Sequence, residues 1–172
     1  ATGGSGVLSL FGGTLRLIGL AEKGYGAGAV NLSGGRVETF TNGIAIAADV
    51  PVTLTTGDAG DTAFAQAGAG QTNTLAGTLS GTGGLVQEGP GALALAGMNT
   101  FGGRAAVRGG ALRIVSELRN ATELVSEGGH LALLAASPGL TNLALRTASA
   151  TARISGDATP FAEGLTLDLA QG

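Results

Sequence analysis

The repeat pattern of this chain is clearest in residues 75–116, LAGTLSGTGGLVQEGPGALALAGMNTFGGRAAVRGGALRIVS, where short apolar runs alternate with glycine pairs. Its most regular part is VRGGALRI at 107–114. Successive side chains of an extended strand point to opposite faces, so Leu112 lies on one face and Arg113 on the other. Glycine can adopt positive φ or let another backbone segment approach closely. The pattern therefore predicts a strand that begins after a sharp corner.

The same corner recurs along the chain. The first aliphatic residue after it recurs at a constant spacing, from Leu93 to Leu112 and again to Leu131. This spacing predicts roughly eight turns of about 20 residues. We expect Gly110, at a corner, to tolerate a side chain less well than Gly97. The predicted corner glycines are Gly12, Gly13, Gly34, Gly35, Gly89, Gly91, Gly109, Gly110, Gly128 and Gly129.

A repeat this short favours strands over helices. The chain lacks long amphipathic segments with a period of 3.6 residues, and strand repeats of about 20 residues stack as a β-solenoid. We therefore predict an all-β fold, a single-stranded right-handed parallel β-helix that forms one continuous body over residues 1–172. The region with the least regular pattern, 57–74, is expected to leave this body as a loop.

The composition agrees with a solenoid and excludes several classes of protein. The chain has 33 glycines among 172 residues, with 44% apolar and 3% aromatic residues, so Leu, Val, Ile and Ala must build the core. A net charge of −3 gives no excess positive field for nucleic acid. Without cysteine there are no disulfides or thiolate metal sites. No apolar run approaches the ~20 residues of a membrane-spanning helix.

Residues 75–116 resemble the autotransporter-associated β-strand repeat. Four segments match its pattern in order: SGTGGLV at 80–86, GALALAG at 91–97, NTF at 99–101 and GGALRIV at 109–115. Phe101 replaces the usual tyrosine, and RAA at 104–106 replaces a threonine-rich run. The resemblance implies a right-handed parallel β-helix in the exported passenger of type V secreted proteins.

A passenger of this kind implies a function as well as a fold. The resemblance implies a structural stalk, outside the cell or on the bacterial surface after export across the outer membrane. Its loops would serve adhesion or self-association, with host or cell-surface molecules as further partners. The repeat has no catalytic residues, so we expect neither enzymatic activity nor a cofactor. A secretion signal and a membrane anchor would then lie outside residues 1–172.

Few residues are candidates for catalysis or metal binding. His130 is the only histidine, it follows a glycine corner, and no Gly-x-Ser-x-Gly motif accompanies it, so we expect a solvated surface side chain. Asp58 and Asp61 share a glycine-rich segment and offer the oxygen ligands that Ca²⁺ prefers. The tandem Gly-Gly-x-Gly-x-Asp repeats of calcium-binding β-rolls are absent from the sequence. A solvated acidic turn is therefore the preferred interpretation.

Three charged residues occupy equivalent positions before successive corners. Stacking the repeats places Glu88, Arg108 and Glu127 about 5 Å apart in an alternating ladder on the surface. The simplest interpretation is a set of exposed ion pairs. The alternative is the acid and arginine constellation of a β-helix polysaccharide lyase of the pectate-lyase type, or a glycan-binding module. The absence of Trp, with Tyr25 as the only Tyr, disfavours both sugar-binding alternatives.

Both ends of the chain have ordinary strand patterns. Residues 7–10 and 165–169 alternate as regularly as the segments inside the repeat. Solenoids usually end in polar capping repeats that protect the terminal strand edges. Uncapped ends indicate either that residues 1–172 belong to a longer solenoid or that copies stack end to end, and we expect the isolated chain to associate through its ends.

Overall fold

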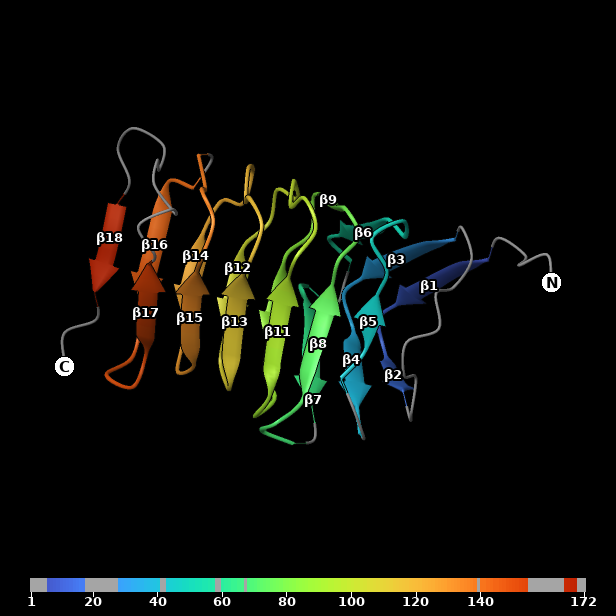
Figure 1. The fold of residues 1–172 in the computed structure, drawn as a ribbon, viewed down its shortest axis with the longest axis horizontal. Coiled ribbons are helices and arrows are strands. Elements are labelled where there is room, and N and C mark those ends of the chain that lie inside the picture. Colours follow the sequence, from blue (N-terminus) through green and yellow to red (C-terminus); the bar gives the residue numbers. More distant parts are fainter. Residues whose placement is uncertain are drawn as a thin grey trace.

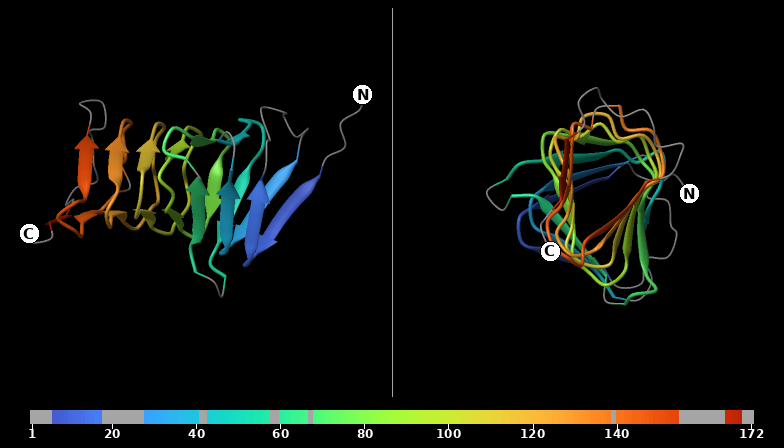
Figure 2. Two further views of the ribbon diagram at one scale, coloured as in Figure 1. Left: turned by 90° about the horizontal axis from the view of Figure 1, so that it is seen from below. Right: turned by 90° about the vertical axis from the view of Figure 1, so that its left-hand side faces the viewer.

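The computed structural model describes residues 6–17, 28–40, 43–57, 60–66, 68–138 and 140–154, together with the backbone of 166–169. Within these residues every regular element is a strand, and the strands stack along one axis with the N-terminal end and the C-terminal end at opposite ends of the stack (Figure 1). Seen along this axis, the chain coils around a common centre (Figure 2). No helix in this described part is long and apolar enough to cross a membrane.

The strands form three sheets, and every strand pairs with its sheet neighbours in parallel. The four-stranded sheet contains β1 (Val7–Phe11), β3 (Ala29–Ser33), β6 (Val52–Thr55) and β9 (Leu79–Gly81). The eight-stranded sheet contains β2 (Thr14–Leu17), β4 (Arg36–Thr39), β7 (Thr62–Gln66), β10 (Leu85–Gln87), β12 (Ala105–Val107), β14 (Leu124–Ser126), β16 (Asn142–Leu145) and β18 (Thr166–Leu169). The six-stranded sheet contains β5 (Ala45–Ile46), β8 (Thr72–Leu75), β11 (Ala92–Leu95), β13 (Ala111–Ile114), β15 (His130–Leu133) and β17 (Thr151–Ile154). The predicted all-β parallel solenoid is confirmed.

The register reproduces the predicted spacing in the middle of the chain. Leu112 pairs with Leu93 on one side and with Leu131 on the other, each one repeat away. Nearer the N-terminus the turns are longer, since Val37 pairs with Phe64, well beyond the predicted spacing. The described strands make about six turns, the number of strands in the six-stranded sheet. This count is slightly below the predicted eight, although the eight-stranded sheet has one strand for each predicted turn.

The core is a set of aliphatic stacks in the interior of the coil. Leu112 and Ile114 are fully buried, whereas Arg113 between them is exposed, which confirms the predicted inward and outward faces. Leu93 and Leu131 continue the stack of Leu112 above and below it, and both are buried. Burying one leucine side chain contributes about 1.5–3 kcal/mol, so the repeated stacks stabilise every turn against its neighbours.

Glycine is required at the corners for two different reasons. Gly110 has φ 61°, and a β-carbon there would lie 1.9 Å from the carbonyl oxygen of Gly91 in the preceding turn. A β-carbon at Gly97 would also lie 1.9 Å from a carbonyl oxygen, that of Gly77. Close backbone approach therefore constrains both glycines, and the positive φ of Gly110 is the additional constraint that supports its expected lower tolerance of a side chain. Positive φ also occurs at Gly12, Gly13, Gly34, Gly35 and Gly128, while close approach to the neighbouring turn constrains Gly89, Gly91, Gly109 and Gly129.

The expectation of a loop over 57–74 was wrong. The region contains β7 and β8, which pair in register with strands of the neighbouring turns. Among the described residues of this region, Gly57 and Gly60 form an antiparallel bridge, and residues 68–70 form a turn between the two strands. The sequence pattern did not predict these strands because several of their inward positions are polar, which interrupts the apolar alternation. Asn73 is buried at the position that Leu93 occupies in the next turn, and Gln66 is buried beside Thr39 of the preceding turn.

Several buried polar side chains have partners inside the coil, whereas the Nδ2 of Asn73 and the Oδ1 of Asn99 have none among the described residues. Gln66 donates to the Oε1 of Gln87 at 3.0 Å, and the Gln87 amide donates back to the Oε1 of Gln66 at 2.6 Å. The Oδ1 of Asn73 accepts from the backbone N–H of Ile44 at 3.0 Å. A buried polar group without a partner costs about 1–3 kcal/mol, so such pairs allow polar residues within an apolar stack.

Candidate functional site

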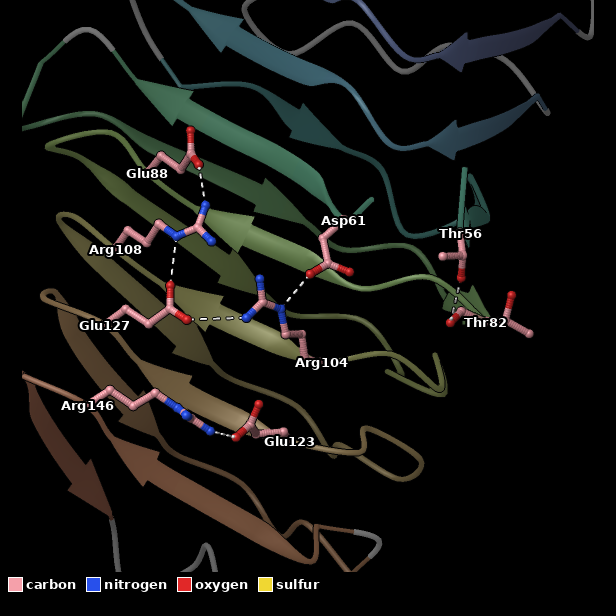
Figure 3. Close-up of polar contacts among 9 residues, drawn as sticks. All are labelled: Thr56, Asp61, Thr82, Glu88, Arg104, Arg108, Glu123, Glu127 and Arg146. Atoms are coloured by element: carbon pink, nitrogen blue, oxygen red, sulfur yellow. Dashed lines mark hydrogen bonds and ion pairs between the residues drawn. The ribbon is translucent and has the colours of Figure 1, made fainter. Parts of the chain in front are cut away.

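The three residues of the sequence-derived ladder lie side by side at the ends of consecutive strands. Glu88, Arg108 and Glu127 directly follow β10, β12 and β14, whose last residues pair in register. Arg108 bridges the two acids, with its Nη1 2.9 Å from Glu88 Oε1 and its Nε 2.7 Å from Glu127 Oε2 (Figure 3). The structure thus brings all three side chains together as consecutive ion pairs.

The chain of ion pairs continues toward the N-terminus. Glu88 also pairs with Arg36, which follows the glycine corner before β4. Arg36 Nε lies 2.8 Å from Glu38 Oε1, and the second oxygen of Glu38 lies 3.0 Å from Arg16 Nε. Glu88 and Arg36 are 52 residues apart in sequence and meet only through the stacking of turns.

A further set of ion pairs runs along the strands and connects their two ends through Arg104. Arg104 precedes β12, and its Nη1 lies 3.2 Å from Glu127 Oε1 while its Nε lies 2.6 Å from Asp61 Oδ2 (Figure 3). The whole set, which we call the charge network, comprises Arg16, Arg36, Arg104, Arg108, Glu38, Asp61, Glu88 and Glu127. Four arginines balance four carboxylates, so the network has no net charge to attract a ligand.

The ion pairs favour the charged forms of Arg36, Glu38, Arg108 and Glu127. The hydrogen bond to Glu127 is the main cause that raises the pKa of Arg108, and the same bond lowers the pKa of Glu127. The hydrogen bond to Glu38 raises the pKa of Arg36 and lowers that of Glu38 in the same way. An arginine that acts as a base must lose its proton. These contacts oppose that loss at Arg108 and so do not favour the lyase interpretation.

Beneath the network lies an apolar stripe that the sequence analysis missed. Val86, Ala106, Val125 and Ala144 occupy the outward face of the eight-stranded sheet, yet they are buried and form a second small cluster. The Arg104 side chain enters from one end of these strands and Glu127 from the other, so their pair spans the outward face (Figure 3). Long charged side chains cover apolar surface with their stems. The signal in the sequence is an apolar residue at the middle of each of these strands.

A second crossing pair lies further along the same sheet. Arg146 follows β16, and its Nη2 lies 2.6 Å from Oε1 of Glu123, which precedes β14 (Figure 3). The side-chain amide of Asn142 donates to the same oxygen at 3.2 Å. This sheet face is therefore closed by polar side chains over several successive turns.

The remaining candidates show no metal-binding or catalytic arrangement in the part of the chain that the structure describes. Asp58 lies outside the described residues, and the carboxylate of Asp61 is occupied by Arg104. The described residues contain no group of three or more histidine or acidic side chains that could hold a metal ion. His130 is exposed on the six-stranded sheet, where its Nδ1 lies 2.5 Å from the hydroxyl of Thr151. Its expected surface position is confirmed.

Comparison with known proteins finds no family model, no curated protein and no solved structure that matches this chain. The fold agrees with the parallel β-helix that the autotransporter-associated repeat implies. The resemblance to that repeat rests on the sequence pattern of residues 75–116 alone.

Proposed function

We propose that the chain is a non-catalytic structural scaffold, a stalk segment of an autotransporter-like surface protein that presents its surface for adhesion or self-association. The observation that carries this proposal is the uninterrupted in-register stack from β8 through β17, in which each strand of the six-stranded sheet continues the preceding one. Six turns at about 4.8 Å each make a rod on the order of 30 Å long. Each added turn extends such a rod without a new kind of contact.

Export to the cell surface is part of the proposal. The repeat pattern of residues 75–116 supports it, and a chain without cysteine cannot form disulfides that would hinder passage in extended form. Antibodies raised against the chain should label intact cells of the source organism, and added protease should remove the signal. Labelling that requires permeabilised cells would contradict a surface location.

Self-association through the ends is supported by the exposed strands there. Edge strand β1 exposes Val7 and Phe11, with 67% and 81% of their surface accessible. At the other end, β17 and β18 are the last strands of their sheets. A second copy stacked head to tail would continue parallel pairing, which produces open assemblies rather than closed dimers.

A dilution series measured by light scattering tests this association. We expect the apparent mass to rise with concentration, and the Phe11→Glu variant to prevent the rise because it places a charge at the interface. Met98→Glu is the matched control, since Met98 is 50% exposed on a middle turn. A constant monomeric mass at high concentration, or an equal effect of both variants, would contradict association through the ends.

A further inference from the structure

Two arginines differ from the others in their surroundings. Six arginines form ion pairs: Arg16, Arg36, Arg104, Arg108, Arg119 and Arg146. Arg113 and Arg153 have no ion pair with any residue in the described part of the chain, and both are exposed. They lie on the same outward face of the six-stranded sheet, on β13 and β17.

The register places a small residue between these two arginines. Arg113 pairs with Ala132 of β15, and Ala132 pairs with Arg153 (β13, β15 and β17 in Figure 1). Two strand spacings separate the arginines by about 10 Å. In the charge network, by contrast, the ladder of Glu88, Arg108 and Glu127 alternates in sign. On the six-stranded sheet, Ala132 occupies the position at which an acidic residue would give the same alternation.

The space above Ala132 is an open groove. A depression of about 390 Å³ is lined by Arg113, His130, Ala132, Thr151 and Arg153 among others. His130 and Thr151 form the neighbouring row, with their polar atoms 2.5 Å apart. Two guanidinium groups, a hydroxyl and an imidazole therefore border a space to which no described residue contributes a carboxylate.

We propose that this groove binds an oxyanion, the carboxylate, sulfate or phosphate group of an acidic ligand, in place of the missing acid between Arg113 and Arg153. A guanidinium presents its N–H donors in a planar fork that matches two oxygens of such a group. Because His130 Nδ1 and the Thr151 hydroxyl are bonded to each other, the tautomer of the neutral imidazole decides whether the hydroxyl or the Nε2–H of His130 donates a further hydrogen bond. Because the chain has a net charge of −3 and 3% aromatic residues, recognition is local and lacks the broad positive field and the stacking surfaces typical of nucleic-acid binding.

The only histidine of the chain provides a reporter inside the groove. The imidazole resonances of His130 are followed by NMR at constant pH and ionic strength while sodium chloride is replaced by sulfate, phosphate or acetate. We expect a saturable shift with at least one oxyanion and none with chloride. The order of the three affinities distinguishes a sulfated, a phosphorylated and a carboxylated source of the ligand.

Variants locate the effect in the groove. Arg113→Gln is expected to weaken binding about tenfold, since it removes a charge-assisted hydrogen-bond donor, and the double variant with Arg153→Gln should abolish saturation. Ala132→Glu should abolish it as well, because an internal carboxylate would pair with both arginines. Arg119→Gln, which removes an exposed arginine paired with Glu117, should bind like the unaltered protein.

Several results would overturn the proposal. These are a shift that grows linearly without saturation, a shift of equal size in chloride, or saturation that survives in the double arginine variant. The double variant changes only exposed side chains and keeps the test decisive should Ala132→Glu fail to fold. Far-UV circular dichroism and thermal unfolding confirm that each variant compared retains the fold.

Discussion

Truncation of a stacked leucine measures what the interior of the coil contributes. Leu112 is fully buried between Leu93 and Leu131. Leu112→Ala removes three carbons, which costs about 2.4 kcal/mol at ~0.8 kcal/mol for each buried group. The neighbouring turns are held in register by backbone hydrogen bonds and cannot collapse fully into the space. The cavity left behind therefore raises the expected loss to about 3 kcal/mol.

The assay is urea unfolding followed by far-UV circular dichroism, since the chain has no Trp and one Tyr. Arg113→Ala is the matched control in the same strand, and its exposed side chain should change the free energy of unfolding by less than about 0.5 kcal/mol. Because each turn contacts only its neighbours, hydrogen exchange in Leu112→Ala should accelerate first in β11, β13 and β15. Equal losses from the two variants would refute the inward and outward assignment.

Three further predictions concern a corner, the charge network and the buried amides. Gly110→Ala should destabilise the protein by more than about 1 kcal/mol. Gly102→Ala is the control and should be nearly neutral in thermal unfolding, because a β-carbon at Gly102 would meet nothing closer than 3.7 Å. Similar melting temperatures of the two variants would show that the corner is not constrained. Because the folded-state pKa of Glu127 is lowered, its ion pairs stabilise the fold above the ordinary carboxylate pKa of about 4.3, and this contribution is lost as the pH falls through the folded pKa. Glu127→Gln should therefore cost about 1 kcal/mol at pH 7 and nothing in strong acid, and a loss independent of pH in urea titrations would exclude this cause. Gln87→Leu should cost about 1–3 kcal/mol because it leaves the side-chain amide of Gln66 and the carbonyl oxygens of Gly89 and Gly91 without this partner. The double variant with Gln66→Leu should recover the part of that loss that comes from the Gln66 amide in the same assay, and additive losses would contradict a coupled pair.

The sequence was most informative where inward positions are aliphatic. Around Leu112 the alternation with Arg113 predicts both the strand and its buried face, because a period of two leaves only one way to place a leucine inside and an arginine outside. The constant spacing that separates Leu112 from Leu93 and Leu131 then predicts which strands are neighbours, and the structure has this register.

The pattern failed where polar residues occupy the interior. Gln66 and Asn73 look like surface residues in the sequence, yet both are buried because partners from other turns bond to them. Those partners are many residues away, so no local pattern reveals them. The strands within 57–74 were not predicted for the same reason, because their polar inward residues have partners in other turns of the coil.

For the candidate sites, too, the sequence predicted the contacts between regularly spaced turns and not the others. The alignment of corners brought Glu88, Arg108 and Glu127 together correctly, but Arg36 and Asp61 join them from turns with longer and irregular periods. The sequence did not predict the groove at Arg113, although Ala132 follows Arg113 at the same spacing at which Leu131 follows Leu112. Only the register shows that the opposite neighbour of Ala132 is a second arginine.

Contacts of Leu112 with both Leu93 and Leu131 in solution would test the parallel solenoid most directly. Methyl NOE spectroscopy on protein labelled at leucine methyl groups, with assignments from single Leu→Val variants, measures these contacts. Parallel stacking with one strand spacing of about 4.8 Å predicts strong cross-peaks from Leu112 to both partners. Cross-peaks to neither leucine, or to residues that do not lie one turn away, would contradict the parallel solenoid.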